Sequence, residues 1–141
     1  MDSEKEFINM LRYNGYVKGV RPFICNIAKT SNAFGDVSHK YIISYRDDEI
    51  YFQSLNYFSE IPNNKNDYTV KVEDLRSYTY VVLNDKLVSF SLITKRKRNI
   101  NLLIMKNVKK RVHSQISFND FIDYLKEHGI NDEDEKDRQT D

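Results

Sequence analysis

The sequence predicts an α+β fold in which a mostly antiparallel β sheet is closed by one C-terminal helix. Two observations predict it: at least five short strand-like runs lie between residues 40 and 104, and an amphipathic segment at residues 117–128 follows them. Strands gathered in one part of a chain and helices in another are typical of α+β architecture. A chain of 141 residues has the size of a single domain.

The C-terminal helix is predicted from its start, its periodicity and its end. Ser117 followed by Asp120 resembles a capping box, and the acidic group suits the positive end of a helix dipole. Gly129 is a stop signal. Four apolar residues recur at helical spacing and share one face: Phe118, Phe121, Ile122 and Leu125. Because such a stripe is usually buried, we expect the helix to pack on the sheet rather than to bind a ligand.

The N-terminal part of the chain is less regular. Ser3 and Glu6 form a second capping-box pattern, which predicts a short helix over residues 4–12. Residues 21–30 fit a first strand with Pro22 at its start, and they fit a second helix nearly as well. Residues 31–38 contain asparagine, glycine and aspartate and predict a connecting loop.

The sheet signal is clearest in the middle of the chain, where β-branched and aromatic residues alternate with polar ones. Two-residue turns at Asp47–Asp48 and Asn84–Asp85 predict hairpins, and residues 56–67 predict one long loop. Glu73 and Asp74 interrupt the pattern in a bend. The predicted strands are residues 40–46, 49–55, 68–72, 75–83, 87–94 and 100–104.

This order of elements resembles the pleckstrin-homology-like (PH-like) superfold, and in particular the small bacterial PH-like domains. The matching parts are the hairpins at residues 41–55 and 81–94, the strand and bend at residues 68–78, and the helix at residues 117–128. The resemblance implies a roll or barrel of seven strands in two near-orthogonal sheets, with the helix plugging an open corner. On this basis we expect residues 38–129 to be the PH-like domain and residues 1–37 to be an N-terminal extension that completes the roll or forms a separate arm. The acidic composition of residues 130–141 predicts a disordered tail, most of which lies outside the residues that the structure describes.

Composition favours a protein of the cytoplasm. Cys25 is the only cysteine, which excludes an internal disulfide, and no apolar run approaches the roughly 20 residues that cross a bilayer. The first six residues lack the layout of a signal peptide. Abundant Asn, Lys, Ile and Tyr fit an AT-rich coding sequence, such as that of a low-GC bacterium or its phage.

No catalytic, cofactor-binding or metal-binding motif is recognisable, so we expect a non-enzymatic protein. The three histidines lie far apart, and the four glycines form no phosphate-binding loop. Cys25 and His39 could in principle act as nucleophile and base, but a lone cysteine between isoleucines is more often a buried small hydrophobe. The acidic residues around Asp47 fit a solvated turn better than a cation site.

Charge is concentrated in one segment. The tail at residues 131–141 has a net charge of −4, which leaves +5 on residues 1–130, and residues 95–111 contain no acidic residue. The candidate binding residues are the eight cations of this segment: Lys95, Arg96, Lys97, Arg98, Lys106, Lys109, Lys110 and Arg111. They predict contact with a protein partner or an anionic membrane surface.

Two other interpretations of the basic segment stay open. One is nucleic-acid binding, with tyrosines as stacking platforms, although the strand tyrosines are equally well explained as sheet residues. The other is a merely solubilising surface, which the acidic tail would partly neutralise. PH domains that bind phosphoinositides carry their cations on the first hairpin, so the resemblance argues against that ligand here, because the corresponding turn is Asp47–Asp48.

Overall fold

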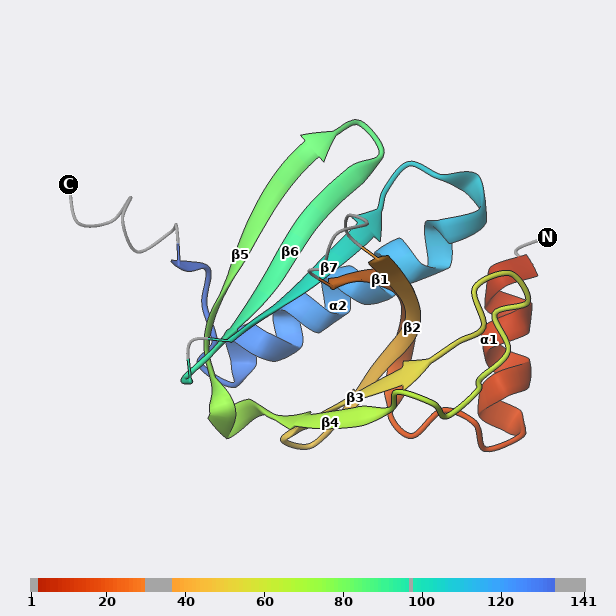
Figure 1. Ribbon diagram of the computed structural model, residues 1–141, viewed down its shortest axis with the longest axis horizontal. Coiled ribbons are helices and arrows are strands. Elements are labelled where there is room, and N and C mark those ends of the chain that lie inside the picture. The colour runs from red at the N-terminus through yellow and green to blue at the C-terminus, as the bar shows by residue number, and fades with distance from the viewer. Residues whose placement is uncertain (1–2, 30–36, 97, 134–141) are drawn as a thin grey trace.

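The computed structural model describes residues 3–29, 37–96 and 98–133 (Figure 1). It confirms the predicted α+β class, the short N-terminal helix and the C-terminal helix. The helices are α1 (Ser3–Tyr13) and α2 (Val112–Glu127). The strands are β1 (Val20–Lys29), β2 (Val37–Arg46), β3 (Glu49–Ser54), β4 (Tyr68–Lys71), β5 (Leu75–Asn84), β6 (Leu87–Thr94) and β7 (Asn99–Met105), with 3-10 turns η1 (Val72–Asp74) and η2 (Lys109–Arg111).

All seven strands form one antiparallel sheet in the order β4-β3-β2-β1-β7-β6-β5. Residues 20–29, which fit either a strand or a helix in the sequence, form β1. This strand pairs Cys25 with Tyr41 of β2 and Ile27 with Leu102 of β7. The N-terminal segment 1–37 therefore supplies the strand that joins the two halves of the sheet. The sheet is not closed, since β4 and β5 are its two edges.

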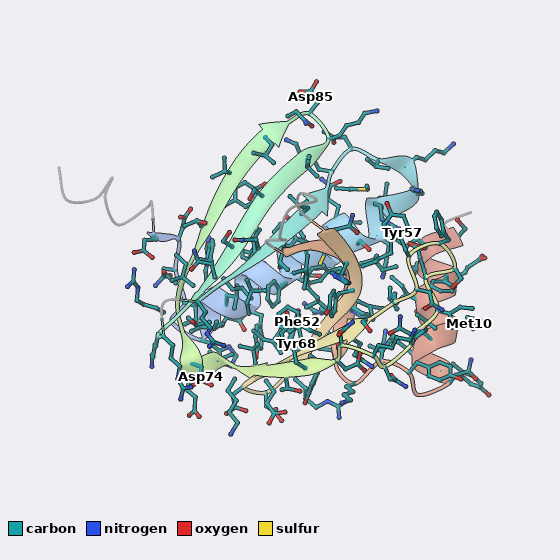
Figure 2. The ribbon with its side chains drawn as sticks, in the orientation of Figure 1. Met10, Phe52, Tyr57, Tyr68, Asp74 and Asp85 are labelled. Atoms are coloured by element: carbon teal, nitrogen blue, oxygen red, sulfur yellow. The ribbon has the colours of Figure 1, made fainter. Side chains whose placement is uncertain are left out.

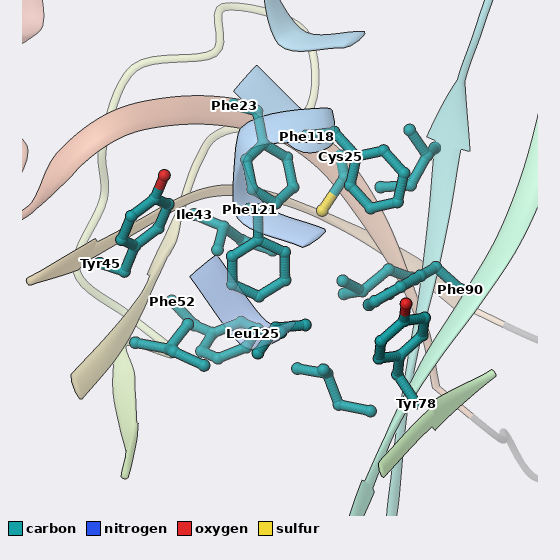
Figure 3. Close-up of a cluster of buried hydrophobic side chains, with 14 of the residues drawn as sticks. Phe23, Cys25, Ile43, Tyr45, Phe52, Tyr78, Phe90, Phe118, Phe121 and Leu125 are labelled. Atoms are coloured by element: carbon teal, nitrogen blue, oxygen red, sulfur yellow. The ribbon is translucent and has the colours of Figure 1, made fainter. Parts of the chain in front are cut away.

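The sheet bends around α2, whose apolar face fills the concave side (Figure 1). The ring centroid of Phe121 lies 5.3 Å from that of Phe23, 5.8 Å from Tyr45 and 6.2 Å from Phe90 (Figure 3). Phe118 and Leu125 are buried in the same core, as predicted, whereas Ile122 is only partly buried. The main core therefore draws on both halves of the sheet and on one helix.

A second apolar cluster covers the other face of the sheet. Ile8 and Leu11 of α1 pack against Ile24 of β1 and Ile42 of β2, which alternate with the residues that face α2. Because neighbouring residues of a strand point to opposite faces, β1 and β2 are buried on both sides. In the part of the chain that the structure describes, no helix is long and apolar enough to span a bilayer.

The start of α2 corrects the sequence prediction. The helix begins at Val112, and Ser117, expected as its cap, is buried within it. The cap comes from α1: a carboxylate oxygen of Glu4 accepts a hydrogen bond of 2.8 Å from the amide of Ser114. The prediction of a start at Ser117 was wrong because the capping group lies 110 positions away in the sequence.

Truncation of the central ring should strongly destabilise this fold. Phe121→Ala leaves a cavity among three aromatic side chains, and we expect it to lower the free energy of unfolding by about 3–5 kcal/mol. Ile116→Ala on the outer face of α2, where the side chain is 58% exposed, is the matched control and should cost less than about 0.5 kcal/mol. Urea denaturation measures both, and equal losses would contradict the core assignment.

Candidate functional site

The fold divides the predicted basic segment into two groups. One lies on the turn between β6 and β7, and the other follows the far end of β7. Seven strand residues separate them, which corresponds to about 23 Å at 3.3 Å per residue. The first group is Lys95, Arg96 and Arg98; the second is Lys106, Lys109 and Lys110. Lys97 lies outside the described residues.

Hydrogen bonds hold the β6–β7 turn in place. The amide of Thr94 donates to the carbonyl of Arg98 at 3.0 Å, and the amide of Arg98 donates to the hydroxyl of Thr94 at 3.0 Å. The amide of Lys95 donates to the carbonyl of Asp74 in η1 at 2.9 Å. The backbone that carries the three cations is thus fixed to both its own hairpin and the bend before β5. Their side chains are exposed.

The turn borders a cavity of about 790 Å³. Its walls come from the end of β1, from β4 and from the start of β7, and its lining includes the apolar side chains of Ile27, Val70 and Ile100 together with the three cations of the turn. Asp74 is the only acidic residue among the lining. The cavity therefore combines a positive rim with a partly apolar wall.

Tyr68 of β4 also lines this cavity. Its ring stacks on Phe52 at a centroid distance of 4.6 Å, and Figure 2 shows the two side by side. Burial, followed by the nearby Tyr41, raises the pKa of the Tyr68 hydroxyl above its ordinary value. The phenol stays protonated at neutral pH, so it can donate a hydrogen bond.

Lys110 of the second group lines two other cavities. One, of about 590 Å³, lies at the β5–β6 turn and includes Leu87, Met105 and Lys110. The other, of about 260 Å³, includes Lys110 with Tyr57 and Phe58 of the long loop. Tyr57 is 54% exposed and Phe58 is 93% exposed. The ammonium of Lys40 lies 5.0 Å from the centre of the Tyr57 ring, within the range of a cation–π contact.

Arg111 belongs to neither group, because its side chain is buried in an ion-pair cluster. One guanidinium nitrogen lies 2.6 Å from a carboxylate oxygen of Glu4, and another contacts Glu60 of the long loop. Burial alone would lower the pKa of Arg111, but its hydrogen bonds to the two carboxylates outweigh burial and raise it. Arg111 thus fastens α1 and the long loop to the start of α2, and only 8% of its surface is exposed.

The other groups singled out in the sequence are accounted for by the fold. Cys25 is buried, and this burial raises the pKa of its thiol, so it is not an activated nucleophile. The backbone carbonyls of Asp47 and Asp48 accept hydrogen bonds from the Tyr124 hydroxyl at 2.7 Å and the Val72 amide at 2.8 Å. Within residues 3–29, 37–96 and 98–133, no three His, Cys, Asp or Glu side chains are grouped to hold a metal ion.

Sequence reasoning missed the residues that form the wall of the large cavity. Ile27, Tyr68, Val70 and Ile100 belong to three strands and meet only because the sheet bends. Each has the ordinary apolar or aromatic character of a strand residue, so no local signal distinguishes it. Only the cations of the rim were visible in the sequence.

Among known proteins, no family model matches this chain and no curated protein is similar to it.

Loss of Arg111 should destabilise the protein rather than weaken a surface contact. Arg111→Ala leaves Glu4 buried without its charge partner, and we expect a loss of about 3–5 kcal/mol in the free energy of unfolding. Arg21→Ala, which removes a mostly exposed contact of 3.8 Å with Asp120, is the control and should cost at most about 1 kcal/mol. Chemical denaturation compares them, and a cost for Arg111→Ala no larger than that of the control would contradict the assignment.

Proposed function

We propose that this protein is a non-enzymatic binding module of the PH-like type, which recognises an acidic segment of a partner protein at the cavity beside the β6–β7 turn. One observation carries the proposal. Lys95, Arg96 and Arg98 are exposed on the rim of this cavity, and none of them forms an ion pair with another described residue.

The PH-like assignment is supported by the seven antiparallel strands and by the C-terminal helix on the concave side of the sheet. These features agree with a roll plugged by a helix. The β1–β7 pairing makes the two halves continuous, which accounts for the N-terminal strand that the pattern of residues 38–129 lacks. The departure is that the two edge strands, β4 and β5, do not pair with each other, so the sheet stays open.

The chemistry of the cavity favours an acidic peptide segment over a flat membrane. Arginine side chains bind carboxylates and phosphates through two parallel hydrogen bonds, and Arg96 and Arg98 both line the cavity. If a carboxylate or phosphate of the partner binds at the rim, the apolar side chain next to it in the partner's sequence can contact Val70 and Ile100. A concave site with one apolar wall suits a side chain that enters it, whereas a bilayer presents a broad surface.

A binding titration tests the proposal with a labelled short peptide of alternating Glu and Leu residues as the probe. We expect Arg96→Glu combined with Arg98→Glu to weaken binding at least about 10-fold, because two charge-assisted hydrogen bonds are lost. Lys109→Glu combined with Lys110→Glu makes the same change in net charge at the other end of β7 and should weaken binding much less. Equal losses in both double variants would contradict a defined site and indicate only general attraction.

The same titration distinguishes other partners. Vesicles that contain phosphatidylserine test an anionic membrane, and tight vesicle binding without peptide binding would overturn the choice of partner. Both probes are measured at two salt concentrations, because exposed charge contacts weaken as salt is added.

Nucleic-acid binding is the second candidate, and one observation favours it. Tyr57 and Phe58 are exposed beside Lys110, and exposed aromatic rings next to cations are typical of single-strand binding surfaces. If this function is correct, the Lys109→Glu, Lys110→Glu variant should bind single-stranded DNA and RNA more weakly than the unchanged protein. The Arg96→Glu, Arg98→Glu variant should keep its affinity. No salt-sensitive affinity for either nucleic acid would exclude this function.

A further inference from the structure

Strand β4 forms an open edge of the sheet, and this edge borders the large cavity. In the described part of the chain β4 pairs with β3 alone, and it lies at the lower border of the molecule in Figure 1. Its consecutive residues Tyr68, Thr69 and Val70 all line the cavity. Because neighbouring side chains of a strand point to opposite faces, a cavity against one face would contact only alternate residues. The cavity therefore reaches β4 from its free edge.

The direction of the hydrogen bonds of β3 follows from the residue after it. The amide of Leu55 donates to the carbonyl of Lys40 at 2.9 Å, so the backbone groups of Leu55 point to β2. In an antiparallel strand the N–H and C=O of one residue point to the same side, and this side alternates along the strand. Ile50 and Phe52 therefore point away from β2 and toward β4.

The same alternation leaves two residues of β4 free to bond. Tyr68 and Val70 lie opposite the outward residues of β3 and exchange hydrogen bonds with them, whereas Thr69 and Lys71 point away. A second bond agrees, because the amide of Val72 donates to a carbonyl of the β2–β3 turn at 2.8 Å. The carbonyl of Lys71 belongs to the same trans peptide and so points the other way. The edge thus offers the N–H and C=O groups of Thr69 and Lys71 to an added strand.

We infer that the acidic partner segment binds as a strand added to β4, with backbone hydrogen bonds to Thr69 and Lys71. This inference rests on the proposed function, since the cations of the β6–β7 turn select the partner. An extended segment can pair with an open sheet edge through its main chain and place alternate side chains in pockets. Side chains on the same face as Val70 would enter the cavity, which explains why its apolar wall adjoins a free edge.

The charges at the end of β4 favour an acidic segment as the added strand. The amide of Lys95 donates to the carbonyl of Asp74 at 2.9 Å, which holds the β6–β7 turn against η1, directly after β4. A strand that continues past Lys71 therefore arrives at the exposed cations of the turn, which include Arg96 and Arg98. Lys71 is itself exposed on the edge. A lysine there disfavours pairing with a basic strand and suits an acidic one.

Amide hydrogen exchange of the full chain, followed by NMR with and without a saturating amount of the Glu–Leu peptide, tests the added strand. Exchange at Thr69 and Lys71 should slow at least about 10-fold on binding, because their amides gain a peptide carbonyl as acceptor. The amides of Tyr68 and Val70 are the internal controls and should change little, since they are bonded to β3 in both states.

The outcomes separate this inference from the proposed function. Peptide binding without slower exchange at Thr69 and Lys71 would overturn the added strand and leave the proposed function intact, whereas no peptide binding would overturn both. Slow exchange of both amides in the free protein that depends on protein concentration would also overturn the inference, because a second copy would then occupy the edge.

Two methylated peptides provide a test that needs no change in the protein. One carries N-methyl groups on its Glu residues and the other carries them on its Leu residues. In an added strand only alternate N–H groups point to β4. One of the two peptides should therefore bind at least about 10-fold more weakly than the unmethylated peptide, because it loses two or more hydrogen bonds, while the other keeps its affinity. The direction of the added strand decides which one it is, and equal losses in both would overturn the inference.

A variant of the edge itself gives the third measurement. Thr69→Pro removes one outward N–H and no bond to β3, and proline is tolerated on an edge strand in this position. We expect it to weaken binding of the Glu–Leu peptide about 5-fold or more, because a hydrogen bond is lost and the ring obstructs the edge. Thr69→Val keeps the N–H and is the matched control, which should bind as the unchanged protein does. Circular dichroism establishes folding, and a folded Thr69→Pro variant with unchanged affinity would contradict the added strand.

Discussion

The burial of Phe121 among Phe23, Tyr45 and Phe90 is the constraint on which the rest of the structure depends. Phe121 comes from α2, Phe23 from β1 in the middle of the sheet, and the other two rings from the two halves of the sheet. The four rings can meet only if the sheet bends around the helix (Figure 3). Each fully buried aromatic ring contributes roughly 1.5–3 kcal/mol. Strand β1 makes the bend feasible, because it pairs with β2 on one side and β7 on the other.

The candidate site follows from the same bend. Strands β4 and β7 are not neighbours in the sheet, yet residues of both line the large cavity, so curvature rather than hydrogen bonding brings them together. The β6–β7 turn then lies at the rim of this cavity, and its bond to Asp74 keeps it there. At the other end of β7, the buried contacts of Arg111 with Glu4 and Glu60 hold α1 and the long loop against the start of α2. One basic stretch of sequence consequently serves two purposes, since Arg111 stabilises the fold and Lys95, Arg96 and Arg98 remain exposed.

Local patterns predicted the elements whose structure has local causes. The stripe that contains Phe118, Phe121 and Leu125, and the two-residue turn at Asp47–Asp48, needed only the neighbouring sequence. The second hairpin was also predicted, but its turn residues are Asp85 and Lys86 rather than Asn84 and Asp85, because Asn84 still pairs with Leu87. Two features could not be predicted because their partners are distant in the chain: the cap that Glu4 gives to α2 and the burial of Arg111. For residues 20–29 the sequence left a strand and a helix open, because only the pairing with β2 and β7 decides between them. For the site, sequence identified the cations but not the wall they border, because Ile27, Val70 and Ile100 meet only in the folded sheet.

The central claim is that an acidic partner binds where the cavity meets the β6–β7 turn. Amide chemical shifts of isotope-labelled protein, followed by NMR during titration with the Glu–Leu peptide, test it most directly. We expect the largest changes in residues 68–70 of β4, in residues 94–96 and in residues 98–101, because these residues line the cavity. Changes confined to Lys106, Lys109 and Lys110, or to Tyr57 and Phe58, would contradict the claim and place the contact at the other end of β7.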